Sequence, residues 1–188
     1  MKQFSFTLSA LVIIHLSFAQ SIRYEFAAPN SAHHEAEISL AVDKLPSAPV
    51  YFRMSRSSPG RYATHEFGKN VYNVKAFDAT GKPLIIEKED ADVYRINKHN
   101  GFAKVSYTLF ANYPDGTYAG VDISSYHLNM PAVFMWVKGF DRAPITIHFA
   151  IPDTNWTIAT QLKPTAEPTT FTAPGLQYFM DAPTKIGM

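Results

Sequence analysis

Alternation of apolar and polar residues in short segments runs along almost the whole 188-residue chain. In residues 35–42, Ile38, Leu40 and Val42 alternate with smaller or more polar neighbours, which is typical of a strand with one buried face. Pro and Gly interrupt the pattern at near-regular intervals, and no stretch of ten residues has the periodicity of an amphipathic helix. These features predict an all-β fold, an antiparallel β-sandwich of about a dozen short strands with little helix.

Two segments depart from simple alternation. Residues 62–70 are expected to form the only short helical turn, and residues 132–137 are apolar without a break, which predicts a strand buried on both faces. Asn100-Gly101 is typical of the turn of a β-hairpin. The remaining strands are expected at residues 22–28, 35–42, 50–54, 71–77, 83–87, 93–96, 102–111, 145–151 and 156–162, and two further short apolar runs lie in residues 171–180.

The first residues have the composition of an export signal. Lys2 precedes an apolar segment at residues 4–16, and Ser17 and Ala19 are small residues at the two positions that a signal peptidase reads. We therefore expect residues 1–19 to be a signal peptide and residues 20–188 to form one domain, exported to the periplasm or the medium. No segment reaches the roughly 20 apolar residues of a membrane-spanning helix, so no membrane span is expected.

Charge and cysteine content limit the classes of partner. The chain has 17 Lys and Arg against 16 Asp and Glu, and a nearly neutral protein is poorly suited to nucleic acid or anionic membranes. It has no cysteine, so neither disulfides nor a thiol nucleophile is available. A chain of this length buries enough surface to fold without disulfides.

Residues 115–140 combine turn residues with polar and aromatic side chains, and they contain the apolar run 132–137 near their end. Functional groups on a loop that a buried element holds in place are a common arrangement for a binding site. The alternative for each group is a structural hydrogen bond within the loop. The candidates in this loop are Asp115, Tyr118, Asp122, Tyr126, His127 and Asn129.

No catalytic apparatus is evident in the sequence. A zinc peptidase helix needs HExxH, but residues 65–69 read HEFGK, with Lys69 where the second histidine would stand. An ammonium group does not bind zinc, and neither a GxSxG elbow nor a phosphate-binding glycine loop is present. We therefore expect no catalytic residue, no metal site and no cofactor in this chain.

Five groups of residues follow one another in an order that is known from one family. They are residues 58–62 (SPGRY) with 65–71 (HEFGKNV), 115–118 (DGTY), 127–132 (HLNMPA), 159–162 (ATQL), and 171–174 (FTAP) with 178–183 (YFMDAP). Together they resemble the N-terminal domain of peptidase family M61, the glycyl aminopeptidase-like zinc metallopeptidases. The resemblance covers residues 22–187, nearly all of the chain after the expected signal peptide.

The resemblance implies a β-rich, non-catalytic domain. In the family it precedes a thermolysin-like catalytic domain, in which HExxH and a downstream Glu hold zinc and activate water for peptide hydrolysis. The implied partner is therefore an M61-type catalytic domain that is absent from this chain, and zinc is expected there. Whether the parent protein is an active peptidase stays open, because Lys185 stands where the family usually has an acidic residue after Asp-x-Pro.

The resemblance also implies where a substrate would lie. Residues 115–129 are expected to face the peptide-binding cleft of the catalytic domain, with an aspartate meeting a substrate ammonium group. Arg61 and Tyr62 are expected to brace this loop from below. The candidates for the substrate cleft or the domain interface are Asp115, Tyr118, Asp122, Tyr126, His127, Asn129 and Asp181.

Two other functions remain open at this point. A free-standing exported β-sandwich would bind glycan or peptide through exposed aromatics, with Tyr118, Tyr126 and Trp156 as stacking residues. A degenerate family member would serve as an interaction module. Residues 174–188 are rich in apolar residues and poor in charge, which favours docking on a catalytic domain over solitary binding.

Overall fold

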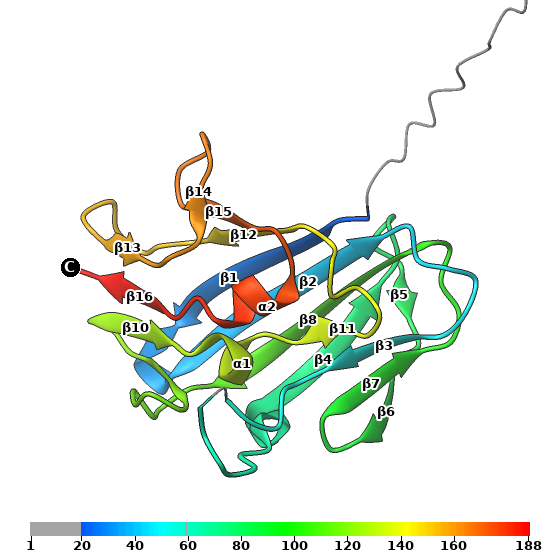
Figure 1. Cartoon of the computed structure of the whole chain (residues 1–188), viewed down its shortest axis with the longest axis horizontal. Coiled ribbons are helices and arrows are strands. Elements are labelled where there is room, and N and C mark those ends of the chain that lie inside the picture. Colours follow the sequence, from blue (N-terminus) through cyan, green and yellow to red (C-terminus); the bar gives the residue numbers. More distant parts are fainter. Residues whose placement is uncertain (1–19, 59) are drawn as a thin grey trace, which may run out of the picture.

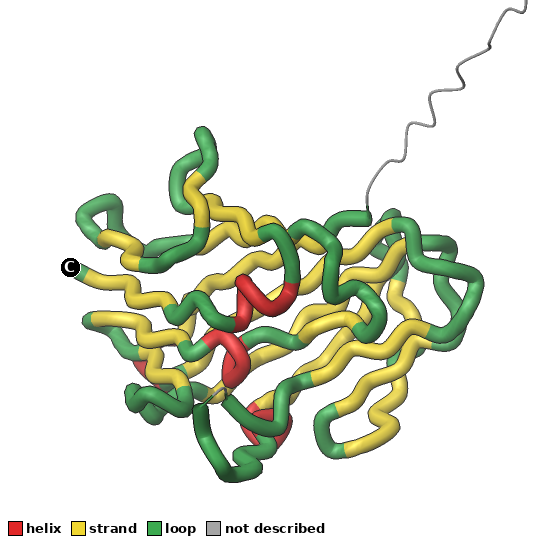
Figure 2. The backbone as a smooth tube through the Cα atoms, viewed as in Figure 1, coloured by secondary structure: helices red, strands yellow, loops and turns green. Residues whose placement is uncertain are grey.

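The computed structural model describes residues 20–58 and 60–188. Within these residues, sixteen strands form three sheets, and the helical segments are two short α-helices and two 3-10 turns. Figure 1 shows the largest sheet behind the other elements, and Figure 2 shows how little of the chain is helical. The predicted all-β sandwich with little helix is confirmed.

The largest sheet has eight strands and is mixed rather than purely antiparallel. Strand β1 pairs with β2 in an antiparallel hairpin and with β12 in parallel, so that Ile22 lies beside Ile145. The parallel pair is possible because the chain passes through strands of both smaller sheets between β1 and β12. The two strands are therefore not joined by a hairpin, which would make them antiparallel. In spatial order the strands are β14 (Lys163–Pro164), β15 (Thr170–Ala173), β12 (Ile145–Phe149), β1 (Ile22–Asn30), β2 (Glu35–Asp43), β8 (Phe102–Phe110), β4 (Val71–Phe77) and β5 (Pro83–Leu84).

The two smaller sheets have four strands each. One holds β13 (Thr157–Ala159), β16 (Thr184–Gly187), β10 (Ser125–Leu128) and β9 (Ala119–Val121). The other holds β11 (Trp136–Val137), β3 (Val50–Arg53), β7 (Val93–Ile96) and β6 (Glu87–Asp90).

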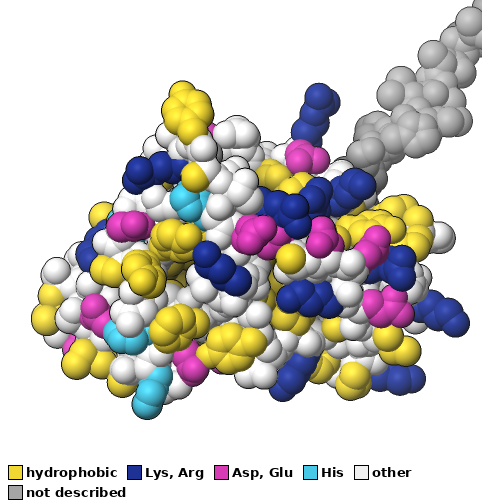
Figure 3. All heavy atoms as spheres, turned by 90° about the horizontal axis from the view of Figure 1, so that it is seen from below, with side chains coloured by type: hydrophobic (Ala, Val, Ile, Leu, Met, Phe, Trp, Pro, Cys, Tyr) yellow, Lys and Arg dark blue, Asp and Glu magenta, His cyan; other side chains and the backbone are white. Residues whose placement is uncertain are grey.

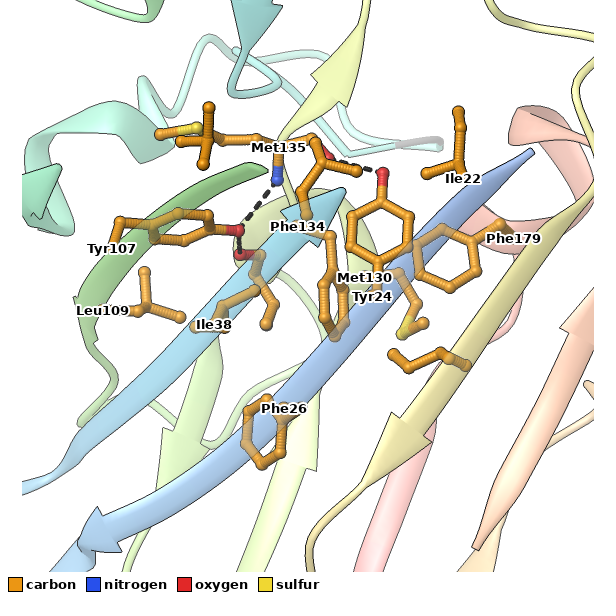
Figure 4. Close-up of a cluster of buried hydrophobic side chains, with 14 of the residues drawn as sticks. Ile22, Tyr24, Phe26, Ile38, Tyr107, Leu109, Met130, Phe134, Met135 and Phe179 are labelled. Atoms are coloured by element: carbon orange, nitrogen blue, oxygen red, sulfur yellow. Dashed lines mark hydrogen bonds between the residues drawn. The ribbon is translucent and has the colours of Figure 1, made fainter. Parts of the chain in front are cut away.

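The core lies on the inner face of the eight-stranded sheet, where the two smaller sheets and two short helices, α1 (Met130–Val133) and α2 (Leu176–Met180), contribute buried residues. Tyr24 of β1 stacks on Phe179 of α2 at 4.8 Å between ring centroids, and its ring edge meets Phe134, just after α1, at 5.4 Å. Figure 4 shows these rings together, with Phe26 farther along the same strand. All four aromatic side chains are almost completely buried, so this cluster fixes both helices on the sheet.

The apolar run 132–137 is buried as expected except at Trp136, which is partly exposed, but the prediction of one continuous strand is wrong. Helix α1, whose opening suits Pro131, takes the first two residues of the run, and only Trp136–Val137 is strand. Between α1 and β11, backbone groups of Val133 and Met135 are satisfied by side chains instead of a sheet. The Tyr107 hydroxyl donates to the Val133 carbonyl at 2.8 Å and accepts from the Met135 N–H at 3.0 Å, and the Tyr24 hydroxyl donates to the Met135 carbonyl at 2.6 Å.

Other expected elements differ in extent. The helical turn at 62–70 is reduced to a 3-10 turn, η2 (Phe67–Asn70), and a second one, η1 (Ser31–His33), joins β1 to β2. The segment 83–87 crosses between two sheets, because β5 ends at Leu84 and β6 begins at Glu87. The run 171–180 gives one strand and then α2. Four strands were not expected: β9, β10, β14 and β16.

The expected signal peptide, residues 1–19, lies outside the described residues, so export stays a prediction. In the part of the chain that the structure describes, no helix is long and apolar enough to cross a membrane.

Candidate functional site

The loop before β9 is organised by Asp115. One oxygen of its carboxylate, Oδ1, accepts from the backbone N–H groups of Thr117 at 2.8 Å and Tyr118 at 2.7 Å. Such a turn is a local structure that Asp forms readily. The backbone N–H groups of Tyr118 and Thr117, followed by the charges of Arg61 and His127, hold the pKa of Asp115 below its ordinary value. The carboxylate is exposed and remains ionised over a wide pH range.

His127 and Asn129 tie this loop to neighbouring elements. His127, on β10, has its Nε2 atom 2.9 Å from the Asp115 carbonyl oxygen. Asn129 donates from Nδ2 to the Thr117 carbonyl and, at 3.1 Å, to the Ser58 hydroxyl. Ser58 belongs to the loop between β3 and η2, so Asn129 links two loops that lie far apart in the sequence.

Tyr118 is the centre of an aromatic and cationic cluster. The Lys69 ammonium lies 5.4 Å from the centroid of the Tyr118 ring and donates to its hydroxyl at 3.4 Å. The edge of the ring meets His65 and Phe67, at 5.5 and 5.4 Å between centroids, and Tyr113 lies 5.8 Å away. Sequence reasoning missed Lys69 and Tyr113 as partners of Tyr118, and only the density of aromatic residues on both sides of the loop pointed to them.

Arg61 and Tyr62 lie beside the loop but not in the same way. The Arg61 guanidinium is close enough to lower the pKa of Asp115 through its charge, which is consistent with support of the loop. Tyr62 is fully exposed, at 107% of its reference area. Its ring is therefore free to meet a partner and does not pack beneath residues 115–129.

Asp122 forms a second turn, between β9 and β10. Its Oδ1 atom accepts from the N–H and hydroxyl groups of Ser124, both at 2.6 Å, and from the Ser125 N–H at 3.0 Å. These contacts, led by the Ser124 hydroxyl, and the charge of Lys185 lower the pKa of Asp122. The Lys185 ammonium donates to the Ser125 hydroxyl at 2.9 Å, so the residue that departs from the family pattern stands beside this turn.

The structure does not bring Tyr126 and Asp181 into the same cluster. Tyr126 is 1% exposed and packs in the core against Phe26 and Trp156, with ring centroids 5.8 and 5.0 Å away. Asp181 ends α2 and accepts from the Gln177 side chain at 2.7 Å. Its contacts lie around α2, apart from residues 115–129 (Figure 1).

The surface around these loops is apolar for an exposed surface. Seen from below, hydrophobic side chains and the visible histidines gather on the half of the molecule that carries β9, β10 and α1, whereas most Lys and Arg lie on the half that carries β3, β6 and β7 (Figure 3). Tyr62, Tyr113 and Ile123, all in loops near β9 and β10, are 107%, 67% and 75% exposed. Exposed apolar groups in one region are typical of a contact surface.

In residues 20–58 and 60–188, no three His, Asp or Glu side chains come together to hold a metal ion. Residues 115–129 and the loop between β3 and η2 together form a loop cluster. Its polar groups mainly hold the two loops in place, and among the described residues none of them forms a nucleophile–base pair. The cluster presents outward one carboxylate, that of Asp115, beside exposed aromatic rings, and its Oδ2 atom has no hydrogen bond to any residue that the structure describes. Such a carboxylate can accept from a donor group of a ligand.

A pH titration will test the arrangement around Asp115. The fold lowers the pKa of Asp115. Its carboxylate therefore stabilises the loop fully at pH values above the ordinary aspartate pKa of about 3.9. This contribution is lost as the pH falls through the lowered pKa of the folded state. We expect the NMR signals of the Thr117 and Tyr118 amides to shift with a midpoint below about 3.9. Asp115→Asn is expected to remove this transition, and a midpoint at or above the ordinary value would contradict the geometry.

Comparison with known proteins gives one family and several structural neighbours. A model of the Peptidase M61 N-terminal domain matches residues 23–188. An aminopeptidase N family protein from Idiomarina loihiensis has a TM-score of 0.82 at 20% sequence identity, over 88% of this chain and 29% of that one. A mutant M1 zinc metallopeptidase from Deinococcus radiodurans, solved with a Tyr-Ser-Ala substrate, has a TM-score of 0.54 at 9% identity, over 90% and 42% of the two chains.

At these identities the two structures show a shared fold. The present chain spans less than half of each of them. No curated protein matches it.

Proposed function

The chain belongs to the family of Peptidase M61 N-terminal domains, and on this premise we propose that it is the non-catalytic N-terminal domain of an exported, M61-like aminopeptidase. In this proposal it packs on a zinc metallopeptidase domain and shapes the peptide-binding cleft. The observation that carries the proposal is the family match over residues 23–188. The partial coverage of the longer structural neighbours supports it, because one of them is a zinc metallopeptidase with a peptide bound.

The proposed contact surface is the loop cluster. Residues 115–129 are locked to the loop after β3 through Asn129 and Ser58, so the two loops present one surface. Exposed Tyr62 and Tyr113 give this surface apolar area, which a domain interface needs. Tyr118, His127 and Asn129 are proposed to form and support the wall of the cleft, with Tyr126 acting only from the core beneath it.

Among the three aspartates, Asp115 is the best suited to meet the amino group of a peptide. Two backbone N–H groups fix one of its oxygens and keep the carboxylate ionised, while the other oxygen is available to an ammonium group. Asp122 is less suitable because Lys185 stands beside it. Asp181 lies at the end of α2, in a different part of the surface, where a role in the domain interface fits better.

The zinc ion of this proposal belongs to the catalytic domain, since the described residues offer no group of metal ligands. There it would activate water for peptide hydrolysis. Export rests on the composition of residues 1–19 alone.

The alternative, a free-standing domain that binds glycan or peptide through exposed aromatics, is weakened because most of the aromatic residues that it needs are buried. Of the three stacking residues that it needs, Tyr126 and Trp156 are 1% and 8% exposed and pack against each other. Only Tyr118 retains partial exposure. An interaction module without peptidase activity stays a second possibility, to be separated by the following experiment.

The proposal predicts that an antibody against this domain detects a native polypeptide several-fold heavier than the chain. That polypeptide is expected to contain zinc and to release N-terminal glycine from short peptides, and a chelator is expected to abolish this activity until zinc is restored. A band at the mass of this chain would overturn the proposal. A heavy band that hydrolyses no peptide would instead favour the interaction module.

In an active parent protein, Asp115→Asn is expected to raise KM for peptides by about tenfold, the effect of losing one charge-assisted hydrogen bond. Glu167→Gln provides the matched control, because it neutralises an exposed carboxylate in the loop between β14 and β15 and leaves the shape of the side chain unchanged. Equal kinetics for both variants would exclude Asp115 from substrate binding.

A further inference from the structure

The outer face of the eight-stranded sheet contains a hollow of about 580 Å³ that none of the functions above uses. It lies on the side of the sheet opposite to α1 and α2: Tyr24 and Phe26 point to the core, so Glu25 between them points outward. The hollow crosses β12, β1, β2 and β8 and ends at the turn after β4. None of the residues of the loop cluster lines it.

Small side chains make its floor. Strand pairing places Glu25 opposite Ser39, and Ser39 opposite Ser106, in one row across β1, β2 and β8. Ala27 lies beside this row. The outward positions of exposed sheets usually carry long side chains, and short ones in the middle of a wide sheet leave a trough between the longer ones at its sides.

Two charged groups at the trough have no partner. Within the described chain, no hydrogen bond or ion pair is found for the Glu25 carboxylate or the Lys104 ammonium, nor for the hydroxyls of Ser39 and Ser106. In contrast, Glu37 at the edge accepts from Thr108 at 2.9 Å. The centre of the trough therefore offers one carboxylate acceptor, one ammonium donor and two hydroxyls, all available to a ligand.

Aromatic rings complete one side of the trough. Phe77 at the end of β4 and Phe102 at the start of β8 both line it and are half-buried. Each ring offers apolar surface beside the polar floor, which suits a ligand with both C–H faces and hydroxyl groups.

We propose that this trough binds a short neutral oligosaccharide. Sugar hydroxyls both donate and accept, so they match a site that pairs a carboxylate with an ammonium and hydroxyls, and the ring faces of the sugar match Phe77 and Phe102. A simple anion or cation would leave one of the two opposite charges unpaired. An extended peptide binds best along a free strand edge, where backbone groups are available, but β1, β2 and β8 are paired on both sides.

The test uses the full chain and three trisaccharides, namely cellotriose, maltotriose and triacetylchitotriose, with glycylglycine as the zwitterionic competitor. We expect at least one trisaccharide to bind with a dissociation constant of about 1 mM or below. The perturbed backbone NMR signals should lie in β1, β2 and β8. Failure of all three trisaccharides, or perturbation of this trough by glycylglycine alone, overturns the proposal.

Two variants locate the binding, each with a matched control. Ser39→Leu fills the floor, and Glu25→Gln replaces the charged acceptor with a neutral amide. Each is expected to weaken binding at least about tenfold, the equivalent of one charge-assisted hydrogen bond. Thr172→Leu on the same face and Glu167→Gln in the loop between β14 and β15 both change residues that do not line the trough, and they are expected to leave binding unchanged. Binding that survives both trough variants, with unchanged thermal unfolding, refutes the assignment.

Discussion

Tyr107→Phe is expected to lower the free energy of unfolding by about 3 kcal/mol, because one lost hydroxyl leaves two buried backbone groups without a partner. The Val133 carbonyl loses its donor at 2.8 Å and the Met135 N–H loses its acceptor at 3.0 Å. Burial raises the pKa of Tyr107, so the hydroxyl stays protonated and able to donate throughout the stable pH range. Chemical denaturation followed by fluorescence measures the change as a lower midpoint at an unchanged slope.

Two control variants separate the hydrogen bonds from the substitution itself. Tyr24→Phe removes only the donor to the Met135 carbonyl, and we expect it to cost about 1–2 kcal/mol. Tyr94→Phe changes a buried tyrosine whose hydroxyl has no hydrogen bond within the described residues, and we expect less than about 0.5 kcal/mol. If Tyr107→Phe were as mild as Tyr94→Phe, the Tyr107 hydroxyl would not hold the segment between α1 and β11.

The strands with alternating residues could be predicted because burial of one face dictates their pattern. In β2 and β8, every second residue faces the core, and their predicted limits at 35–42 and 102–111 differ from the observed ones by a single residue at one end. The segment 132–137 could not be resolved in the same way. Five of its six residues are buried and all six are apolar, so alternation carries no information, and what breaks it into α1 and β11 is a pair of tyrosine hydroxyls from other strands.

The strands inside the supposed long loop were missed for a related reason. Strand β9 has only three residues, all buried, and it lies so close to the loop before it that a Cβ on Gly120 would come within 2.6 Å of Pro114. Strand β16 was hidden in a terminal segment whose pairing with β10 and β13 comes from elsewhere in the chain. Short segments of this kind take their structure from long-range partners rather than from their own pattern.

The candidate site was predictable to the extent that its contacts are local. The turns of Asp115 and Asp122 follow from Asp beside Gly or Ser within three residues. The contact of Asn129 with Ser58 joins residues 71 positions apart, and neither residue carries a signal of it. Burial of Tyr126 was equally hidden, because its place on β10 depends on a strand that the sequence did not reveal.

Asp92→Ala is expected to lower the free energy of unfolding by about 3 kcal/mol, because Asp92 is a buried carboxylate that is paired with Arg56 and hydrogen-bonded to the backbone. Its side chain is 1% exposed, and Oδ2 accepts from the Arg56 Nε–H at 2.6 Å. The other oxygen accepts from the buried N–H of Gly68 at 3.1 Å. The variant would leave this N–H without a partner and would free Arg56 from its stronger contact.

The location of Asp92 makes the effect larger than the two bonds alone suggest. A Cβ on Gly68 would lie 2.4 Å from Asp92 Oδ1 and 2.8 Å from the Ala91 carbonyl oxygen, so η2 packs directly against the β6–β7 turn. Loss of the carboxylate therefore loosens the loop between β3 and η2, which carries Arg61. We expect amide hydrogen exchange at Gly68 and along this loop to become faster than in the rest of the chain.

Asp90→Ala is the matched control, since Asp90 pairs with the same arginine at 3.0 Å but its side chain is 58% exposed. An exposed ion pair contributes less than about 1 kcal/mol, so the two variants should differ by about 2 kcal/mol. They remove the same charge from neighbouring positions, and therefore long-range electrostatics cannot produce the difference. Equal destabilisation by both would mean that the Arg56 charge, and not the buried bond from Gly68, holds the loop in place.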